Sequence, residues 1–528
     1  MLQLSGALTA GSLLAACSPS SGSKGSSANA GKLLGPADAP YATIYPKLPK
    51  GGSMVMGLLG SSASGLVSLD LLTSTVTASI WAAGPVHDYL EVYDDNSQLK
   101  PSLAQTVTQV NPTTVRYKLR SNLFFHNGQP ITAQDVKDTL DYCMAAANRS
   151  LWLSQLAGVT VAVTDPLTVT LTTAQPSATL RSTLAQLPII PISTAGKQAT
   201  APVGAGPFVF QQWVQDSYLS FTKFDKYWNP DAPRVDTLKI NLVPDANAGL
   251  QSLQARQMEC IFPASVASLA LLKTMSQAGQ ATIYTTPAAM QLGMNNTVKP
   301  FDDPNVRKAV RLAIDKATVV QDVYLGFSQP LVSIGVPVDD YYYPADLAFT
   351  QDLATAKQLI STAGATGTTV NLLCPNSDAY PATAAIVQQN LNAIGLNVKI
   401  ETTDFATVVS RMFTSHSYEI GLVALSMEED PAGHIDRYLL STGASNFSRY
   451  SNPQVDALLK QGHVELDTVK RKAIYDQALK IALIDESAIA PICTDIHIAV
   501  AQGKNPNLSH YGPWPNNMYH WPILVNKA

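Results

Sequence analysis

The chain combines two hydrophobic patterns, one with the spacing of helices and one with that of strands. Apolar residues three or four positions apart favour a helix, and short runs rich in β-branched residues favour a strand. We expect helices to begin at Thr132, Asp303, Asp352 and Asn452, because each is a helix-capping residue type before an amphipathic stretch. The helix after Asp303 is expected to continue to Val320.

Six apolar runs have the length and composition of strands. They are residues 116–119, 159–163, 168–172, 238–243, 370–374 and 398–402. The last two follow helices that end in glycine, at Gly364 and Gly395, as in a βαβ unit. This alternation predicts an α/β protein with a parallel sheet between about residues 295 and 490.

Composition limits the class of protein further. The chain has 528 residues, of which 46% are apolar and 14% charged, so it can bury a large core in more than one domain. The formal net charge is −4 without long runs of one sign, which argues against a nucleic-acid partner. No stretch after the amino terminus is long and apolar enough to predict a membrane-spanning helix.

The amino terminus differs from the rest of the chain. Residues 2–16 are small and apolar and end in a Leu-Ala-Ala-Cys box, and the Ser- and Gly-rich stretch 18–27 cannot pack a core. This box resembles the lipobox of bacterial lipoproteins. We interpret residues 1–16 as a signal peptide and 17–50 as lipid-modified Cys17 with a flexible tether, which would hold the protein extracytoplasmically at the cell membrane. The alternative is that Cys17 is a buried thiol in an ordinary first helix.

Four further cysteines are Cys143, Cys260, Cys374 and Cys493. No pair has Cys-x-x-Cys spacing, so the sequence gives no support to a zinc site or to thioredoxin-like chemistry. An even number in an exported protein allows two disulfide bonds. Four separate buried thiols are the other interpretation.

Six short motifs occur in an order that is typical of one family. They include Leu-Arg-Ser-Asn-Leu-Phe-Phe-His-Asn-Gly, Gly-Ala-Gly-Pro-Phe and Lys-Tyr-Trp, and they occupy residues 90–104, 117–136, 204–208, 226–228, 301–316 and 446–456. The chain resembles family 5 of the bacterial extracellular solute-binding proteins, the peptide and nickel receptors of ABC importers. Each motif is weak alone, but together they span about residues 55–500.

The resemblance implies the class II periplasmic-binding-protein architecture, with two α/β lobes, an additional domain and a ligand cleft between the lobes. Lobe one would combine residues 51–80, 201–290 and 487–528, the additional domain would be 81–200, and lobe two would be 291–486. Closure of the lobes would bury a solute and present it to the ABC permease subunits. We expect a monomer without a cofactor or a metal.

The expected ligand-binding residues come from three kinds of position. An aromatic ring near a domain crossing can stack on a ligand, a glycine allows positive φ and close backbone approach, and the segment before Asp430-Pro431 matches the ligand segment of relatives. The residues are Trp81, Gly206, Leu425, Met427, Glu428, Glu429 and Asn446.

The sequence departs from the family's peptide receptors at two positions. Peptide-binding relatives hold the ligand's α-ammonium with a carboxylate at the position of Met427, and residues 347–351 contain no Lys or Arg for the ligand's carboxylate. An unpartnered buried charge is costly. We therefore expect a longer or modified peptide, an oligosaccharide or a largely neutral metabolite in place of a short peptide zwitterion.

Other candidate residues are interpreted as structural. Phe125 and His126 flank a turn and are expected to satisfy local backbone groups. Trp213, Tyr227 and Trp228 are expected in the core. His434 and Asp436 are too few for a metal site. The sequence at 428–430 is equally consistent with an exposed acidic loop.

Two other functions stay open at this point. A secreted hydrolase would need a triad assembled only in space, because the chain lacks both Gly-x-Ser-x-Gly and His-Glu-x-x-His. A binding receptor that feeds a signalling partner instead of a permease would have the same sequence features.

Overall fold

The structure is a computed structural model that describes most of the chain. It covers residues 32–33, 50–60, 66–74, 77–93, 98–334, 350–426, 430 and 432–502. The lipidation candidate Cys17 lies outside the described residues, so the interpretation of residues 1–50 stays a prediction.

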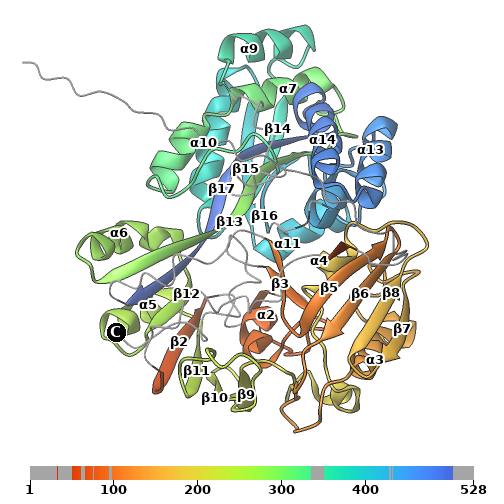
Figure 1. The fold of residues 1–528 in the computed structure, drawn as a ribbon. Helices are drawn as coiled ribbons and strands as arrows, with labels where there is room; N and C mark the ends of the chain where they lie inside the picture. Colours follow the sequence, from red (N-terminus) through yellow and green to blue (C-terminus); the bar gives the residue numbers. More distant parts are fainter. Residues whose placement is uncertain are drawn as a thin grey trace, which may run out of the picture.

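Ten strands form one mixed sheet that extends through the molecule (Figure 1). In spatial order the strands are β15 (Asn397–Thr403), β14 (Thr369–Pro375), β16 (Ile420–Ser426), β13 (Ala281–Met294), β17 (Ile489–Gln502), β12 (Cys260–Ala264), β2 (Ser53–Leu59), β11 (Thr237–Val243), β10 (Tyr218–Lys223) and β9 (Phe208–Val214). β14 pairs in parallel with β15 and β16, which confirms the parallel arrangement expected there. β13 is antiparallel to both of its neighbours.

A second, five-stranded sheet is antiparallel throughout. Its order is β1 (Lys32–Leu33), β5 (Ala104–Asn111), β6 (Thr114–Leu119), β8 (Thr168–Thr172) and β7 (Thr160–Asp165), and a separate hairpin joins β3 (Glu91–Tyr93) to β4 (Leu99–Pro101). In β6, Val115, Tyr117 and Leu119 are buried, while Arg116 and Lys118 are exposed. This period of two is that of a strand with one face on a core.

Helices cover both sheets. The α-helices are α2 (Thr77–Ala83), α3 (Ala133–Met144), α4 (Leu180–Leu184), α5 (Ala246–Gln254), α6 (Leu269–Gln277), α7 (Pro304–Ala313), α8 (Lys316–Thr318), α9 (Leu353–Thr362), α10 (Tyr380–Ala393), α11 (Phe405–Val409), α12 (Arg437–Leu439), α13 (Pro453–Val464) and α14 (Thr468–Leu479). The 3₁₀-helical segments are η1 (Gly84–Val86), η2 (Ala146–Asn148), η3 (Ile192–Lys197) and η4 (Val266–Ser268). The π-helical segments are η5 (Val319–Val323), η6 (Ser410–Thr414), η7 (Ala432–Asp436) and η8 (Lys480–Asp485).

The four predicted helix starts are confirmed. Thr132 forms a capping box with Asp135 before α3, and Asp303, Asp352 and Asn452 accept backbone N–H groups at the starts of α7, α9 and α13.

The predicted extension of α7 to Val320 is wrong. α7 ends at Ala313, and the carboxylate of Asp315 accepts the backbone N–H of Thr318, starting a new short helix, α8. Val320 lies in the π-helical segment η5. A capping side chain inside the apolar pattern thus ends one helix and begins another.

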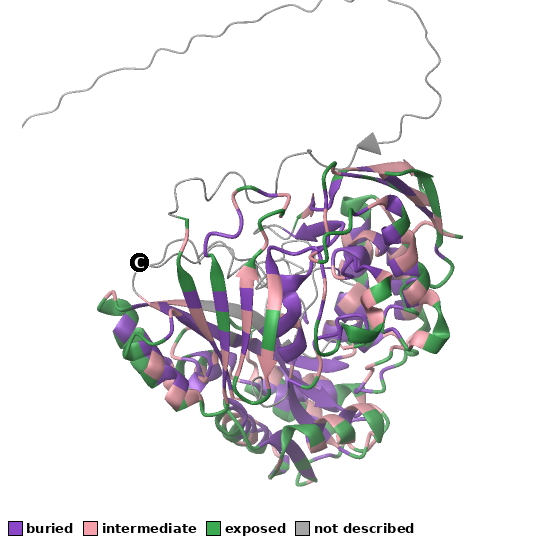
Figure 2. Cartoon of the chain, turned by 90° about the horizontal axis from the view of Figure 1, so that it is seen from below, coloured by how far each residue is buried: buried purple, intermediate pink, exposed green. Residues whose placement is uncertain are grey.

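Buried residues follow the strands and the inner sides of the helices (Figure 2). Among the described residues, four apolar clusters form the core: one contains Tyr117 and Leu140, one Phe208 and Phe221, one Met290 and Val310, and one Phe447 and Tyr475. The boundaries between lobes given above stay a prediction.

All four cysteines in the described part of the chain are buried and free. Of the two interpretations left open by the sequence, the structure therefore supports separate buried thiols. Burial raises the pKa of the Cys374 thiol to about 12 and that of Cys143 to about 11. Such thiols are protonated and unreactive at neutral pH.

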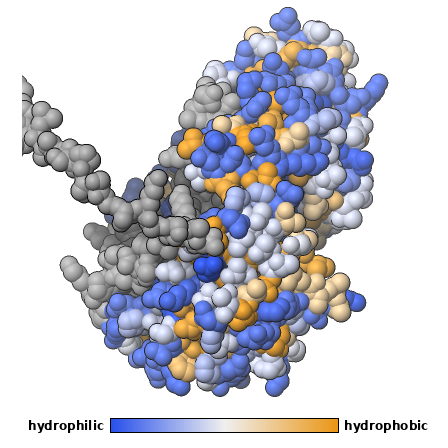
Figure 3. Space-filling model, turned by 45° about the vertical axis from the view of Figure 1, so that its right-hand side comes forward, coloured by the Kyte–Doolittle hydropathy of each residue, from blue (hydrophilic) through white to orange (hydrophobic). Residues whose placement is uncertain are grey.

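The surface mixes polar and apolar residues. On the face in Figure 3, hydrophobic residues lie in small groups among hydrophilic ones. The described residues contain no helix with the length and hydropathy to cross a membrane.

Candidate functional site

Two long strands that sequence patterns did not reveal connect the two halves of the ten-stranded sheet. β13 and β17 pair along most of their length (Figure 1). β16 pairs with β13 only from Ala288 onward, and β12 pairs with β17 only from Ile498 onward. Between these points the described sheet is two strands wide, at the pairs Thr286–His497 and Pro287–Ile496. We call these two pairs the neck.

The expected ligand segment begins beside the neck. β16 runs toward the neck and ends at Ser426, which pairs with Ala288. Leu425 is buried and belongs to the apolar cluster around Phe447. The candidates Met427, Glu428 and Glu429 follow directly in the chain but lie outside the described residues.

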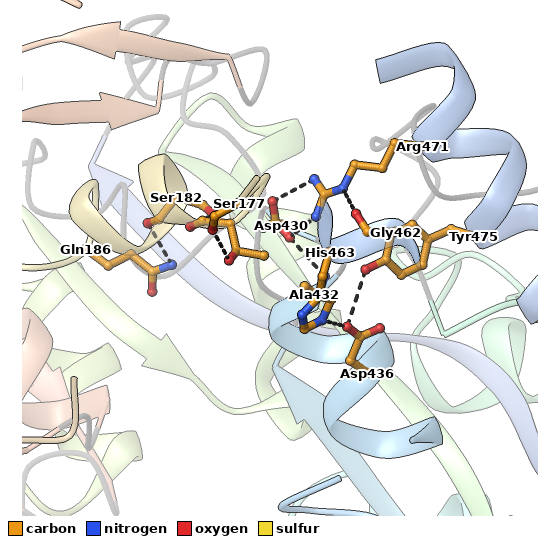
Figure 4. Close-up of polar contacts among 11 residues, drawn as sticks. Ser177, Ser182, Gln186, Asp430, Ala432, Asp436, Gly462, His463, Arg471 and Tyr475 are labelled. Carbon is orange, nitrogen blue, oxygen red and sulfur yellow. Dashed lines mark hydrogen bonds and ion pairs between the residues drawn. The ribbon is translucent and has the colours of Figure 1, made fainter. Parts of the chain in front are cut away.

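A buried ion pair holds the residue that follows these candidates. The guanidinium of Arg471, in α14, donates two hydrogen bonds to the carboxylate of Asp430, at 2.8 and 2.9 Å (Figure 4). The Arg471 Nε also donates to the carbonyl of Gly462, in α13, at 2.9 Å. Bidentate pairing fixes the carboxylate in both position and orientation. Asp430 is therefore held by the protein, and it is not an exposed acidic residue.

A second carboxylate, Asp436, lies in the same cluster (Figure 4). Its Oδ2 contacts the His463 ring Nε2 and accepts a hydrogen bond from the Tyr475 hydroxyl at 3.4 Å. Burial raises the pKa of Asp436 to about 6, despite the opposing effect of His463. The hydrogen bond to Asp436 raises the pKa of His463 against the effect of its burial. Each group thus favours the charged form of the other, and Asp436 is the more deeply buried of the two.

The cluster contacts the segment between β8, a strand of the five-stranded sheet, and α4. The backbone N–H of Ala178 donates to the carbonyl of His463 at 2.9 Å. Ala178 precedes α4, whose Ser182 lies beside the cluster in Figure 4. Residues about 285 positions apart, one between β8 and α4 and the other in α13, are thus joined.

A buried ion pair also supports α4. Arg181 donates to both oxygens of Glu91, through Nε at 3.0 Å and Nη2 at 2.5 Å. The hydroxyl of Tyr117 donates to the same carboxylate at 3.0 Å. Glu91 is fully buried, so these donors satisfy a charge that would otherwise be unfavourable. Rigidly supported segments thus meet at Ala178 and His463.

Trp81 lies in α2, near the middle of the molecule. Its ring packs edge to face on Phe262, with centroids 3.9 Å apart, and it borders the core around Phe208. The ring is only partly buried. Its assignment to the ligand stays a prediction.

Gly206 is enclosed by backbone. A Cβ there would lie 2.6 Å from the His87 carbonyl oxygen and from the Val86 carbonyl carbon, which confirms the expected close approach. Neither Gly206 nor Gly204 has positive φ, so that part of the expectation is wrong. The Gly206 carbonyl also bonds the His126 ring at 2.8 Å, as expected of a structural histidine. A ligand role for Gly206 stays a prediction.

The side-chain amide of Asn446 organises a turn. It donates to the carbonyls of Leu440 and Tyr450 at 3.0 and 2.8 Å, and its oxygen accepts from the Tyr450 N–H at 3.1 Å. The contacts explain why an Asn is needed there. Whether it also contacts a ligand stays a prediction.

Sequence reasoning missed Arg471 and His463. Arg471 lies in the basic run Lys470-Arg471-Lys472, which reads as an exposed helix face, and nothing local pairs it with Asp430, 41 residues earlier. The sequence analysis considered Asp436 together with His434, but the histidine that bonds to the Asp436 carboxylate is His463.

The cluster is suited to holding a segment in place. The charges of Asp430 and Arg471 neutralise each other, and Asp436 is paired with His463. Within the part of the chain that the structure describes, no serine or cysteine side chain bonds to His463, and no group of three or more His, Cys, Asp or Glu residues could hold a metal. The described residues thus do not provide the nucleophile and base of a triad at this histidine.

Comparison with known proteins gives a consistent result. A model of the family described as bacterial extracellular solute-binding proteins, family 5 Middle, matches residues 98–451. The glutathione-binding protein GsiB of Shigella dysenteriae serotype 1 (strain Sd197) is 27% identical over 492 residues, covering 84% of this chain and 95% of GsiB. GsiB of Escherichia coli (strain K12) is 28% identical over 465 residues, covering 84% and 89%.

Solved structures share the fold over about nine tenths of this chain. The ABC transporter substrate-binding protein CtaP of Listeria monocytogenes aligns with a TM-score of 0.81 at 22% identity, covering 91% of this chain and all of CtaP. The periplasmic binding protein DppA of Helicobacter pylori, in complex with peptide STSA, aligns with a TM-score of 0.76 at 22% identity, covering 91% and 99%. The predicted two-lobe, class II α/β fold is thereby confirmed.

Proposed function

The chain belongs to the bacterial extracellular solute-binding proteins, family 5, and on that basis we propose that it receives a peptide-like solute for import. It is a solute-binding protein of an ABC importer, as its relatives are. The peptide class is supported by relatives named for binding glutathione and by a similar fold in complex with a tetrapeptide. A hydrolase is not favoured.

The observation that carries the proposal is the position of the end of β16. The strand ends beside the neck, and the expected ligand segment follows it. A sheet that is two strands wide bends more easily than a sheet with further strands on both edges. The two halves of the ten-stranded sheet can therefore close about the neck. Met427, Glu428 and Glu429 are proposed to contact the solute, and Asp430, which follows them in the chain, is held by Arg471.

The chemistry of the proposed ligand is inferred from two positions that lack the charged side chains of peptide-binding relatives. Met427 cannot pair with an ammonium group, and residues 347–351 provide no cation for a carboxylate. We propose a solute recognised through its peptide backbone or modified ends. Trp81, Gly206, Leu425, Met427, Glu428, Glu429 and Asn446 are the proposed contacts. A short dipeptide with both charged termini is the least favoured peptide.

We further propose a membrane-anchored form that works as a monomer. The Leu-Ala-Ala-Cys box supports a lipid on Cys17, and the Ser- and Gly-rich stretch supports a tether. The anchor would keep the protein beside the permease subunits, on the periplasmic or outer face of the cell membrane.

A thermal-shift screen tests the ligand class. Di-, tri- and longer peptides, glutathione and oligosaccharides are compared at matched concentrations. A ligand at a hundred times its Kd stabilises the folded state by about 2.7 kcal/mol. We expect the largest rise in melting temperature with a longer or modified peptide. The largest rise with dipeptides that have free amines would contradict the inference from Met427, and a rise with oligosaccharides alone would contradict the peptide class.

A further inference from the structure

A cavity separate from the neck is formed by two of the sequence motifs. Its volume is about 510 Å³. It lies where the ends of β5 and β6 meet the loop that follows β10, and neither β13 nor β17 contributes to it. The lining residues are Gln105, Arg120, Ser121, Asn122, Phe124, Lys226, Tyr227 and Trp228. Tyr227 and Trp228 are half-buried here, so the expectation of core positions is only partly met.

Two contacts hold the Arg120 side chain in this cavity, one of its guanidinium group with Trp228 and one of its Nε with Ser102. Its guanidinium carbon lies 4.1 Å from the centre of the Trp228 ring, and its Nε donates to the carbonyl of Ser102 at 2.6 Å. The two terminal nitrogens donate to no described residue, and Nη2 is closed off from solvent. Nη1 is therefore the guanidinium nitrogen that can donate to a ligand in the cavity.

Lys226 provides a second cation in the same lining. Its Nζ lies 4.7 Å from the centre of the Phe124 ring. No carboxylate of the described residues pairs with this exposed ammonium group. Both cations of the cavity therefore rest on aromatic faces, which attract them without neutralising them.

An acidic group that acts on Arg120, the carboxylate of Asp88, already accepts four hydrogen bonds from the protein. Asp88 lies at the edges of the aromatic residues, where its Oδ2 accepts hydrogen bonds from the Trp228 Nε1 at 2.7 Å and the Tyr227 hydroxyl at 3.1 Å. Its Oδ1 accepts from Ser102 Oγ at 2.6 Å and the Tyr89 N–H at 2.7 Å. Burial raises the pKa of Asp88, and the four hydrogen bonds that its carboxylate accepts oppose that rise. No lining residue is acidic.

We propose that this cavity is an oxyanion-binding site that takes the carboxylate or phosphate group of a small solute. The Arg120 Nη1 and the Lys226 ammonium supply two charged donors. Ser121, Asn122 and Gln105 supply neutral donors around them. Binding would give Lys226 a counter-charge that the described residues do not provide. The site is distinct from the solute site proposed at the neck.

Calorimetric titration of the full chain tests this site, with citrate as the carboxylate probe and inorganic phosphate as the other, at constant ionic strength. We expect one of them to bind saturably, and the tighter one identifies the preferred oxyanion. Lys226→Gln is expected to weaken that binding about fivefold, the effect of losing one favourable exposed ion pair. Arg120→Lys keeps the charge but loses the planar group that lies on Trp228 and places Nη1, so it should weaken binding as well.

Lys239→Gln is the matched control. The Lys239 Nζ also lies on an aromatic ring, 4.3 Å from the centre of Tyr218, but it does not line the cavity. The same change of charge is therefore made away from the site, and binding should be unchanged. Equal weakening by both lysine variants, or no saturable binding of either anion at about 1 mM, would overturn the proposal.

Discussion

At the scale of single residues, the charges near the candidate site are used to hold the chain. Asp430 and Arg471 are nearly buried and form two direct hydrogen bonds. Removing one member of such a pair leaves an uncompensated buried charge, which costs more than the pair itself contributes. We therefore expect a large effect on the free energy of unfolding only when one of the two residues is replaced and the other is kept.

Arg471→Ala should destabilise the folded protein by about 3–5 kcal/mol. Asp430 would keep its charge without a partner, and the Gly462 carbonyl would lose a donor. Chemical denaturation monitored by circular dichroism measures the free energy of unfolding. Lys480→Ala is the control, because Lys480 forms an exposed pair with Asp485 at 2.8 Å, and such pairs contribute at most about 1 kcal/mol. Equal losses in the two variants would contradict the assignment of a buried anchor.

The His463–Asp436 contact predicts a pH dependence. The pKa of His463 is raised in the folded state, so the stabilisation from its charged form is present below its ordinary value of 6.5 and is lost as the pH rises through the raised pKa. Asp430 and Arg471 also act on this histidine, in opposite directions. The raised pKa of Asp436 acts in the same sense, because the folded state binds its proton more tightly.

His463→Gln should therefore cost most stability at mildly acidic pH and little at alkaline pH. Melting temperatures of the wild type and the variant, measured between about pH 6 and pH 9, give the difference. We expect that difference to shrink as the pH rises. A difference that is constant or grows with pH would show that the imidazolium–carboxylate contact does not stabilise the fold.

At the scale of elements, the contact of Gly206 with η1 fixes the junction between the two sheets. Gly206→Ala places a methyl group 2.6 Å from the His87 carbonyl oxygen, where the backbone cannot yield. Overpacking of this kind costs about 1–3 kcal/mol. Gly196→Ala is the control, because nothing lies within 4 Å of its Cβ and it lacks positive φ. Denaturant midpoints compare the two variants. If Gly206→Ala cost no more than Gly196→Ala, the junction would not be tightly packed.

Elements with local signals could be predicted from the sequence. A capping residue marks the start of α3, α7, α9 and α13, and β-branched runs mark β6, β8 and β11. β13 and β17 were missed because Ala, Pro, Thr and His interrupt their apolar pattern. Their pairing joins residues about 200 positions apart, so no local pattern could reveal it.

The candidate site was predictable only in part for the same reason. The motif around Asp430 is local in the sequence and could be found, whereas its partner Arg471 comes from a helix 41 residues later. The contact between Ala178 and His463 joins residues about 285 positions apart. Spatial pairing of distant charges is a property of the tertiary structure, and the hydrophobic pattern contains no information about it.

At the scale of the whole molecule, the two halves share one sheet and narrow to the neck. The end of β16 lies next to the neck, and the contact between Ala178 and His463 joins α13 to the segment between β8 and α4. A receptor of this form needs to bind a solute, enclose it and release it unchanged. Nothing in that cycle requires a nucleophile or a metal.

Native mass spectrometry of the full chain, incubated with a mixed pool of peptides and then exchanged into fresh buffer, tests this account most directly. We predict a complex of one protein with one solute, and release of that solute on denaturation with the mass of the intact peptide. Release of shortened or otherwise altered peptides, or the absence of any complex with the pool, would contradict the assignment of a receptor for peptide-like solutes.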